Sequence, residues 1–328
     1  TLYVDDAIVT DAHSPLADVE VKYFADAFKL KMADKPEHFL GANIDIESPT
    51  RIKLSSRAYV AKMAATYLPK PLAEYRTYSL PSSKDILASY ERAVDGKGTD
   101  VCPKLAKSYP SKVGAMIYAP ACSRLDAAFT VNMCARCLAF PTAEMDAHAD
   151  RCIAYMAQHA DYGLTFDAGM PNASRLVAYS DSSWDVTHST TGFGLMYGGA
   201  AVEYCSKRQV SISVSSTEAE IMAASTCALE ILYYRGLLSE MGVDVSEPTI
   251  LYVDNSGAIE LSKHQTSCKR SRHIQRRWLK LRELVAEGHI DVRYIATAEN
   301  PSDMLTKPLA QEPFDKHRVT LMGRGAND

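Results

Sequence analysis

Four carboxylates in the second half of this sequence stand in settings that favour metal binding. Each lies where a predicted strand ends or a predicted helix begins. Two divalent cations held a few ångströms apart need several acidic ligands from separate elements, and such a pair can drive in-line attack of water on a phosphodiester. The pattern therefore predicts a hydrolytic metal centre. The four acids are Asp181, Glu220, Asp254 and Asp303.

The residues before and after Asp181 predict three consecutive strands. The apolar run in 175–179 predicts a strand with Asp181 at its carboxyl end. Two more strand-like segments, 192–197 and 201–206, are separated by the turn pair Gly198-Gly199. These segments predict a three-stranded antiparallel meander that carries the first acid.

Glu220 is predicted to lie in the first turn of a helix. Ser216 or Thr217 can cap that helix, and apolar residues then recur at helical spacing until Gly242 ends it. This places the Glu220 carboxylate on the side of the buried stripe.

Asp254 and Asp303 complete the group at other element ends. The β-branched run 249–253 predicts a buried strand that Asp254 ends, and Asp303 follows Pro301, a favoured first-turn residue. Strand ends and helix starts meet at the edge of an α/β sheet where ligands bind. Any one of these acids alone would more often be a cap or turn residue, but four together predict a site.

Short motifs between residues 175 and 309 resemble, in combination, the ribonuclease H domain of copia-type (Pseudoviridae) retrotransposon polyproteins. The resemblance implies an α/β fold with a ribonuclease H-like mixed five-stranded sheet flanked by helices. It also implies that the four acids hold two Mg²⁺ ions, with Mn²⁺ as an alternative. The motifs are Tyr179-Ser180-Asp181 with Trp184, Ser189-Thr190-Thr191-Gly192, Ser206-Lys207-Arg208-Gln209, Ser215-Ser216-Thr217-Glu218-Ala219-Glu220, Asp254-Asn255-Ser256-Gly257-Ala258-Ile259, Arg272-His273-Ile274 and Asp303-Met304-Leu305-Thr306-Lys307-Pro308.

Two acids compete for these roles, and one expected residue is missing. Glu218 is the alternative to Glu220 on the helix, and Asp185 is the alternative to Asp181 beside the first strand. Bacterial enzymes of the resembled kind carry a His in the loop before the last Asp, whereas residues 296–300 contain none. Proton transfer or product release would then depend on water or on Glu299.

The start of the chain carries a second acidic motif, Tyr3-Val4-Asp5-Asp6, between apolar residues. Two adjacent acids at the tip of an apolar hairpin are costly unless a cation neutralises them. The motif resembles the catalytic hairpin of a reverse transcriptase palm, which implies that Asp5 and Asp6 are catalytic metal ligands. A third palm acid and the nucleotide-binding fingers would precede Thr1, so polymerase activity is expected only of a full-length parent.

Motifs downstream of the hairpin extend the resemblance over most of the chain. They indicate a copia-type Pol fragment that joins the C-terminal part of a reverse transcriptase to ribonuclease H. The motifs are His38-Phe39-Leu40-Gly41, the segment 52–63, Val113-Gly114-Ala115-Met116-Ile117-Tyr118, Arg124-Leu125-Asp126, Val131-Asn132 and Asp161-Tyr162-Gly163-Leu164.

The length of 328 residues and the hydrophobic content of 47% predict about two domains. We expect a truncated palm remnant at 1–68, a linker and helical thumb or connection region at 69–165, ribonuclease H at 171–310 and a C-terminal tail at 311–328. The proline, serine and charged residues of 69–110 predict a partly mobile linker.

The eight cysteines and the lack of a long apolar run predict an intracellular protein. Cys134 and Cys137 have a metal-like spacing, but without a nearby second pair they are better explained as reduced core thiols. No apolar stretch approaches the roughly 20 residues that cross a bilayer, so no membrane contact is expected. The expected location is cytoplasmic, in a virus-like particle, or nuclear, and not secreted.

A net charge of −4 excludes nucleic-acid binding through the field of the whole chain, but a local basic surface remains available. Residues 263–282 contain eight Lys or Arg and no acid, with Arg272, Arg276 and Lys280 at helical spacing. A solvated helix face would explain them equally simply. Next to an acidic metal centre, phosphate binding is the stronger interpretation, with Lys207 and Arg208 on the opposite side.

These features predict hydrolysis of the RNA strand of an RNA–DNA hybrid, with template–primer and the missing N-terminal reverse transcriptase segment as partners in the parent. His273 can equally contact a phosphate or play a structural role. An integrase-like nuclease is disfavoured because Glu220 precedes Asp254. A catalytically dead, nucleic-acid-binding relic of a mobile element is the alternative.

Overall fold

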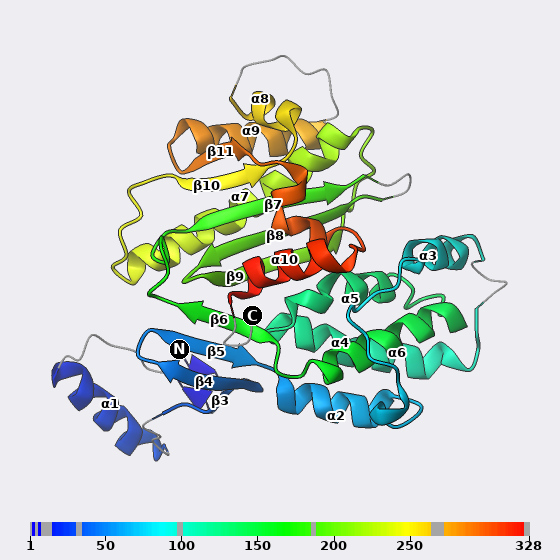
Figure 1. Ribbon diagram of the computed structural model, residues 1–328. Helices are drawn as coiled ribbons and strands as arrows, with labels where there is room; N and C mark the ends of the chain where they lie inside the picture. The colour runs from blue at the N-terminus through cyan, green and yellow to red at the C-terminus, as the bar shows by residue number, and fades with distance from the viewer. Residues whose placement is uncertain are drawn as a thin grey trace.

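In the computed structural model, a four-stranded sheet and a cluster of helices lie beside each other below a five-stranded sheet, and the two sheets contact each other directly (Figure 1). None of the helices in the described part of the chain has the length and apolar character that crossing a membrane requires. The structure describes residues 2–3, 6–7, 15–30, 35–96, 101–184, 188–263 and 272–324.

The larger sheet has the strand order β11-β10-β7-β8-β9. Strands β7, β8 and β9 form an antiparallel meander, while β10 and β11 run parallel to β7. The α/β class and the mixed five-stranded sheet expected from the sequence are therefore confirmed. The strands are β7 (Val177–Ser183), β8 (Thr190–Tyr197), β9 (Ala200–Arg208), β10 (Thr249–Val253) and β11 (Ile290–Tyr294).

The turn between β8 and β9 explains the tight meander. Gly198 and Gly199 have φ angles of +65° and +86°, and two consecutive positive φ values are the signature of a hairpin turn that matches strand twist. The turn was predicted correctly, whereas the first strand begins two residues later than predicted, at Val177.

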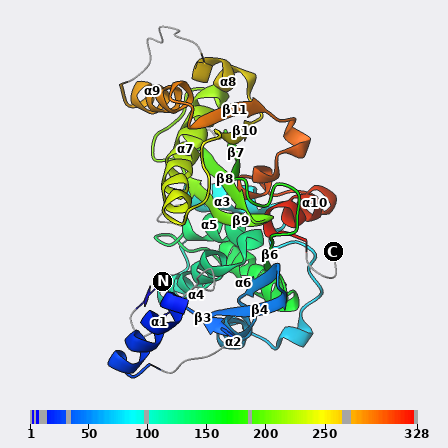
Figure 2. The ribbon, with the colours of Figure 1, turned by 90° about the vertical axis from the view of Figure 1, so that its left-hand side faces the viewer.

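Three helices, α7, α8 and α9, pack together beside the larger sheet, and α7 lies against β7 and β8. Figure 2 shows α7 and α9 on one side of this sheet and α10 on the other. Buried side chains of α7 and α9, such as Ile221, Ile231 and Leu281, meet Leu251 of β10 in one core. The helices are α7 (Ser216–Glu240), α8 (Ser256–Lys263) and α9 (Arg272–Ala286).

The smaller sheet has the order β3-β4-β5-β6, and its last strand comes from a segment more than a hundred residues beyond the others. A side chain at Gly163 of β6 would collide with the Leu54 carbonyl oxygen, because its Cβ would lie 2.1 Å away. Close backbone approach therefore requires glycine there. The strands are β3 (His38–Phe39), β4 (Ala42–Ser48), β5 (Arg51–Ser55) and β6 (Gly163–Asp167).

The helices between β5 and β6 share one hydrophobic core with the C-terminal end of the described chain. Met304, Leu305, Phe314 and Leu321 are buried against residues of the helical cluster. The helical elements are α2 (Arg57–Tyr67), η1 (Leu72–Glu74), α3 (Ile86–Asp95), α4 (Leu105–Cys122), η2 (Leu125–Ala127), α5 (Ala128–Ala135) and α6 (Ala143–Gln158), and at the C-terminal end η4 (Pro301–Leu305) and α10 (Gln311–Met322).

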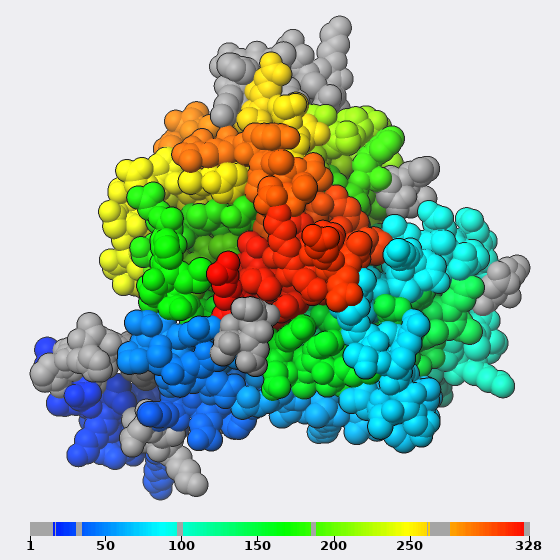
Figure 3. All heavy atoms as spheres, in the orientation of Figure 1, coloured from blue at the N-terminus to red at the C-terminus, as the bar shows by residue number. Residues whose placement is uncertain are grey.

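Two expectations about these segments were wrong. Residues 86–95 are not part of a mobile linker, because they form helix α3, whose Ile86 and Tyr90 are buried in the core. Residues 311–322 form the packed helix α10 and not a tail, and Figure 3 shows C-terminal residues filling the middle of one face. Gly323 (φ +76°) ends α10, and a Cβ there would lie 2.1 Å from the Thr165 carbonyl oxygen of β6. The domain boundaries themselves stay predictions.

The N-terminal hairpin is described only as backbone. β1 (Leu2–Tyr3) and β2 (Asp6–Ala7) are antiparallel, with Tyr3 opposite Asp6, as a tight hairpin requires. Helix α1 (Pro15–Phe28) follows, and η3 (Thr297–Glu299) precedes η4 at the other end of the chain. The assignment of a palm remnant stays a prediction.

A buried ion pair lies where the helical cluster meets α10. Arg124 is fully buried and donates two hydrogen bonds to Asp126, at 3.0 and 2.8 Å, and one to the Met156 carbonyl oxygen at 2.8 Å. The Tyr155 hydroxyl donates to the same Asp126 carboxylate at 3.0 Å. All charges in this group are thus paired within the protein.

Asp126→Asn should lower the free energy of unfolding by about 3–5 kcal/mol, because the Arg124 guanidinium would stay buried without a counter-ion. Urea denaturation measures the change. The matched control is Asp45→Asn, which breaks an exposed two-bond pair with Arg57 (2.8 Å) and should cost about 1 kcal/mol or less. Equal losses in the two variants would contradict the role of the buried pair.

His317 of α10 makes stability depend on pH. Burial, followed by the positive charge of Lys316, lowers the pKa of His317 to about 4. In the unfolded chain His317 becomes protonated near pH 6.5, whereas in the folded chain it stays neutral down to about pH 4. The free energy of unfolding therefore decreases as the pH falls from 6.5 towards 4.

A comparison of the parent with His317→Gln isolates this effect from carboxylates that titrate at similar pH. Between pH 7 and pH 4 the parent should lose up to roughly 3 kcal/mol more unfolding free energy than the variant. Chemical denaturation at several pH values gives both profiles. Parallel profiles would show that His317 does not titrate differently in the two states.

Candidate metal centre

Three of the four predicted acids converge at one end of the larger sheet. Asp181 lies on β7, Glu220 just past the first turn of α7, and Asp254 directly after β10. Each offers a carboxylate oxygen, and these oxygens all lie within 4.8 Å of one another. Asp181 and Glu220 are buried and Asp254 is half-buried. The convergence inferred from strand ends and helix starts is therefore present for these three.

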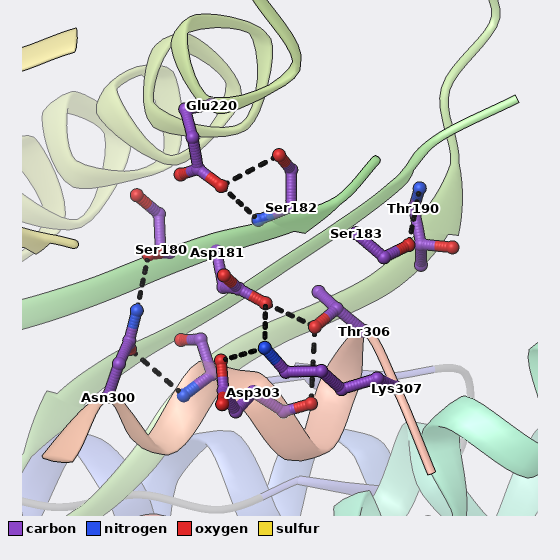
Figure 4. A network of polar contacts seen from close by, with 11 residues as sticks. Ser180, Asp181, Ser182, Ser183, Thr190, Glu220, Asn300, Asp303, Thr306 and Lys307 are labelled. Carbon is purple, nitrogen blue, oxygen red and sulfur yellow. Dashed lines mark hydrogen bonds and ion pairs between the residues drawn. The ribbon is translucent and has the colours of Figure 1, made fainter. Parts of the chain in front are cut away.

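The Glu220 carboxylate is held towards β7 by Ser182. The backbone N–H and the hydroxyl of Ser182 both donate to Glu220 Oε1, at 2.9 and 2.8 Å (Figure 4). Among the described residues, the buried Oε2 has no hydrogen-bond partner. Burial, and then the nearby Asp181 charge, raise the pKa of Glu220 to about 8. The site thus carries an acid oxygen that lacks a donor.

Asp303 reaches the centre from the opposite face of the sheet. The Asn300 amide donates to the Ser180 carbonyl oxygen at 2.9 Å, and the Ser302 hydroxyl donates to that of Tyr179 at 2.9 Å. These bonds fasten the start of η4 to β7. Burial, followed by the Asp181 charge, raises the pKa of Asp303 to about 7.

A lysine connects Asp303 to the other acids. Lys307 Nζ lies 2.8 Å from Asp303 Oδ1 and 4.0 Å from Asp181 Oδ2. The Thr306 hydroxyl donates to Asp181 Oδ2 as well. Asp303 is therefore not one of the three clustered acids but is joined to Asp181 through a cation (Figure 4).

Gly192 makes room for this arrangement. It lies opposite Asp181 in the β7–β8 ladder, and a Cβ there would lie 2.5 Å from the Thr306 methyl carbon and 3.0 Å from Leu305 Cβ. The absence of a side chain lets the turn after η4 approach the strand closely enough for Thr306 to reach Asp181.

The two competing acids have different outcomes. Glu218 is fully buried and belongs to the helix cap, because its backbone N–H donates to Ser215 Oγ and its carboxylate accepts from the Val214 N–H, both at 3.2 Å. Glu220 therefore occupies the centre and Glu218 supports the start of α7. Asp185 lies outside the described residues, as does Asp5, and Asp6 is described only as backbone.

Of the predicted basic contacts, Lys207 and Arg208 are exposed at the end of β9. Lys207 is in register with Thr191 and, through it, with Ser182, so its backbone lies about 10 Å across two strands from the residue next to Asp181. Their expected contact with nucleic acid on the opposite side of the cleft stays a prediction.

The predicted basic face of α9 is described only in part. Arg276 is exposed, but Lys280 pairs with Glu283 at 3.0 Å, an acid that lies just beyond the basic segment. The side chains of Arg272 and His273 lie outside the described residues. Lys280 thus has an acidic partner outside the segment 263–282, and phosphate binding by this face stays a prediction.

The donor set fits a hard divalent cation. Carboxylate oxygens are the ligands that Mg²⁺ and Mn²⁺ take in proteins, and a buried carboxylate oxygen without a donor is costly unless a cation satisfies it. The Asp181, Glu220 and Asp254 group could hold such an ion.

From the sequence, no role was assigned to Lys307 and Thr306, although both occur in one of its motifs. The four-residue spacing of Lys307 from Asp303 was the available signal.

The chain resembles Pol polyproteins of plant transposons along nearly its whole length. It is 28% identical over 317 residues to the retrovirus-related Pol polyprotein from transposon RE1 of Arabidopsis thaliana, covering 95% of this chain and 21% of that protein. It is 29% identical over 323 residues to that of transposon TNT 1-94 of Nicotiana tabacum, covering 96% and 23%. The chain thus spans between a fifth and a quarter of the length of these relatives.

No protein-family profile matches the sequence. Among solved structures, LC11-RNase H1 isolated from compost aligns with 44% of this chain and 97% of its own chain, at 14% identity and a TM-score of 0.31. In sequence, the chain is similar along nearly its whole length to Pol polyproteins of copia-type transposons, as expected of a fragment of such a polyprotein.

Proposed function

We propose that this chain is a reverse transcriptase/ribonuclease H fragment whose metal centre hydrolyses the RNA strand of RNA–DNA hybrids. The observation that carries the proposal is the convergence of three acid oxygens within 4.8 Å, with Asp303 joined to them across the sheet. This geometry suits two closely spaced cations better than a single structural ion, because four carboxylates exceed what one Mg²⁺ usually takes from a protein.

The residues divide the work of the reaction. Asp181, Glu220, Asp254 and Asp303 would hold two Mg²⁺ ions, with Mn²⁺ as an alternative. When bound, such ions activate water and neutralise charge on the leaving 3′ oxygen. Ser182 orients Glu220, and η4 holds Asp303 against β7. A 2′-hydroxyl and the shape of the hybrid groove distinguish the RNA strand.

Substrate binding is assigned to cations on the rim of the centre. Lys207 and Arg208 are exposed and in register with the acid-bearing strands, and Arg276 is exposed on α9. These charges attract phosphates locally although the whole chain is acidic. Arg272 is proposed to act with them, whereas Lys280 is already paired with Glu283.

Polymerase activity is proposed only for a longer protein. Asp5 and Asp6 would contribute two catalytic acids there, with template–primer as substrate. The relatives extend several-fold beyond the aligned region, which is compatible with further polymerase segments in a parent protein.

Asp254→Asn should reduce Mg²⁺-dependent cleavage of a labelled RNA–DNA hybrid at least about a hundredfold, because it removes a ligand charge while keeping the side chain's shape. Gel analysis of both strands gives the rate and the strand cut. Asp161→Asn, an exposed acid away from the centre, is the control and should keep parental activity.

Double-stranded DNA should remain uncut by all three proteins. Unchanged turnover in Asp254→Asn would remove that residue from the proposed centre. If a folded parent protein cleaves no hybrid, the dead-relic alternative holds.

The combined change Lys207→Ala and Arg208→Ala should weaken hybrid binding and reduce the slope of log affinity against log salt by about 2, because each phosphate contact contributes roughly 0.9. Fluorescence anisotropy over a range of salt concentrations measures the slope. Arg293→Ala removes an exposed arginine that pairs with Asp291 at 2.7 Å, and its slope should equal that of the parent. Equal slopes in all proteins would show that Lys207 and Arg208 do not contact the phosphates of the hybrid.

A further inference from the structure

The acidic centre has two unlike halves. In one half, Asp181, Glu220 and Asp254 bring carboxylate oxygens within 4.8 Å of one another. In the other half, Asp181 and Asp303 share the ammonium group of Lys307, at 4.0 and 2.8 Å. Asp181 belongs to both halves, so it is the carboxylate that two neighbouring cations would share.

The place of Lys307 Nζ is where a second divalent ion would be needed. Asp303 lies outside the group of three acids, but its carboxylate neighbours that of Asp181, and Lys307 Nζ contacts both carboxylates. A lysine ammonium is a compact point charge that interacts with carboxylates without coordinating them. It offsets the repulsion between two buried acids when no ion is bound.

We propose that Lys307 is a tethered cation that occupies the second ion position between Asp181 and Asp303 and must move away for a second divalent ion to bind. This inference rests on the proposed two-ion function. The Lys307 side chain is 37% exposed, and its flexible stem can carry the ammonium into solvent while the backbone stays in place. The first ion then binds at Asp181, Glu220 and Asp254, and the second binds more weakly because it competes with Lys307.

An ordinary surface ion pair provides the contrast. Lys316 pairs with Glu299 at 2.5 Å, but that carboxylate is 59% exposed, whereas the side chains of Asp181 and Asp303 are 3% and 8% exposed. Water can solvate Glu299 when its lysine is removed. Water cannot solvate two neighbouring buried carboxylates in the same way, so removing Lys307 destabilises the charged forms of both Asp181 and Asp303.

The test uses the whole chain without nucleic acid and compares the parent with Lys307→Met, Lys307→Arg and the control Lys316→Met. Bound Mn²⁺ is counted from the electron paramagnetic resonance signal of the free ion, and thermal unfolding is followed in chelator and in Mn²⁺. Lys307→Met should melt about 3 °C or more below the parent in chelator and bind its second Mn²⁺ roughly tenfold or more tightly. Lys307→Arg and Lys316→Met should bind both ions like the parent.

Equal affinity for the second Mn²⁺ in the parent and Lys307→Met, or a single bound ion in both, would overturn the proposal. If Lys307→Met does not fold, Lys307→Gln removes the charge with a polar side chain and is judged by the same two readouts. Because neither readout needs cleavage, a chain that binds two ions but cuts no hybrid would refute the proposed function and leave this inference standing.

Discussion

The mutual repulsion of buried carboxylates is the constraint on which the rest of this structure depends. Asp181 and Glu220 are both almost inaccessible to solvent, and the charge of Asp181 contributes to the raised pKa of Glu220 and of Asp303. Such groups do not gather unless the fold compels them and something offsets the charge. Ser182, Thr306 and Lys307 supply that offset through hydrogen bonds and an ion pair. Gathering these carboxylates costs folding free energy, and such clusters with shifted pKa values are typical of functional sites.

Strand order determines which acids can meet. Because β10 lies next to β7 and parallel to it, Asp254 emerges at the same end of the sheet as Asp181, and α7 brings Glu220 over that end from one face. Asp303 arrives from the other face on η4, which packs on β7 and β8. Acids thus reach the end of the sheet from both faces. Because Gly192 has no side chain, Leu305 and Thr306 can pack closely against β8.

Local pattern predicted the parts of this molecule whose burial depends on near neighbours in sequence. The meander, α7 and the strand before Asp254 follow from periodicity and turn residues, and three of the four acids meet as expected. The partners of Lys307 and Lys280 depend on side-chain positions within a helical turn, which one-dimensional spacing leaves open. The packed helices α3 and α10 were missed because their apolar faces are completed by residues far away in the chain, and the polar residues around them resemble a linker and a tail.

The shared core has a consequence for the order of folding during synthesis. Phe314 and Leu321 of α10 complete a cluster most of whose other members lie in α2–α6, and Gly323 lies against the backbone of β6. The helical cluster must therefore wait, with part of its apolar surface open, until the ribosome has released the last of these residues. Residues from distant parts of the described chain thus complete one core, and its exposed apolar surface is open to misassembly until α10 has been made.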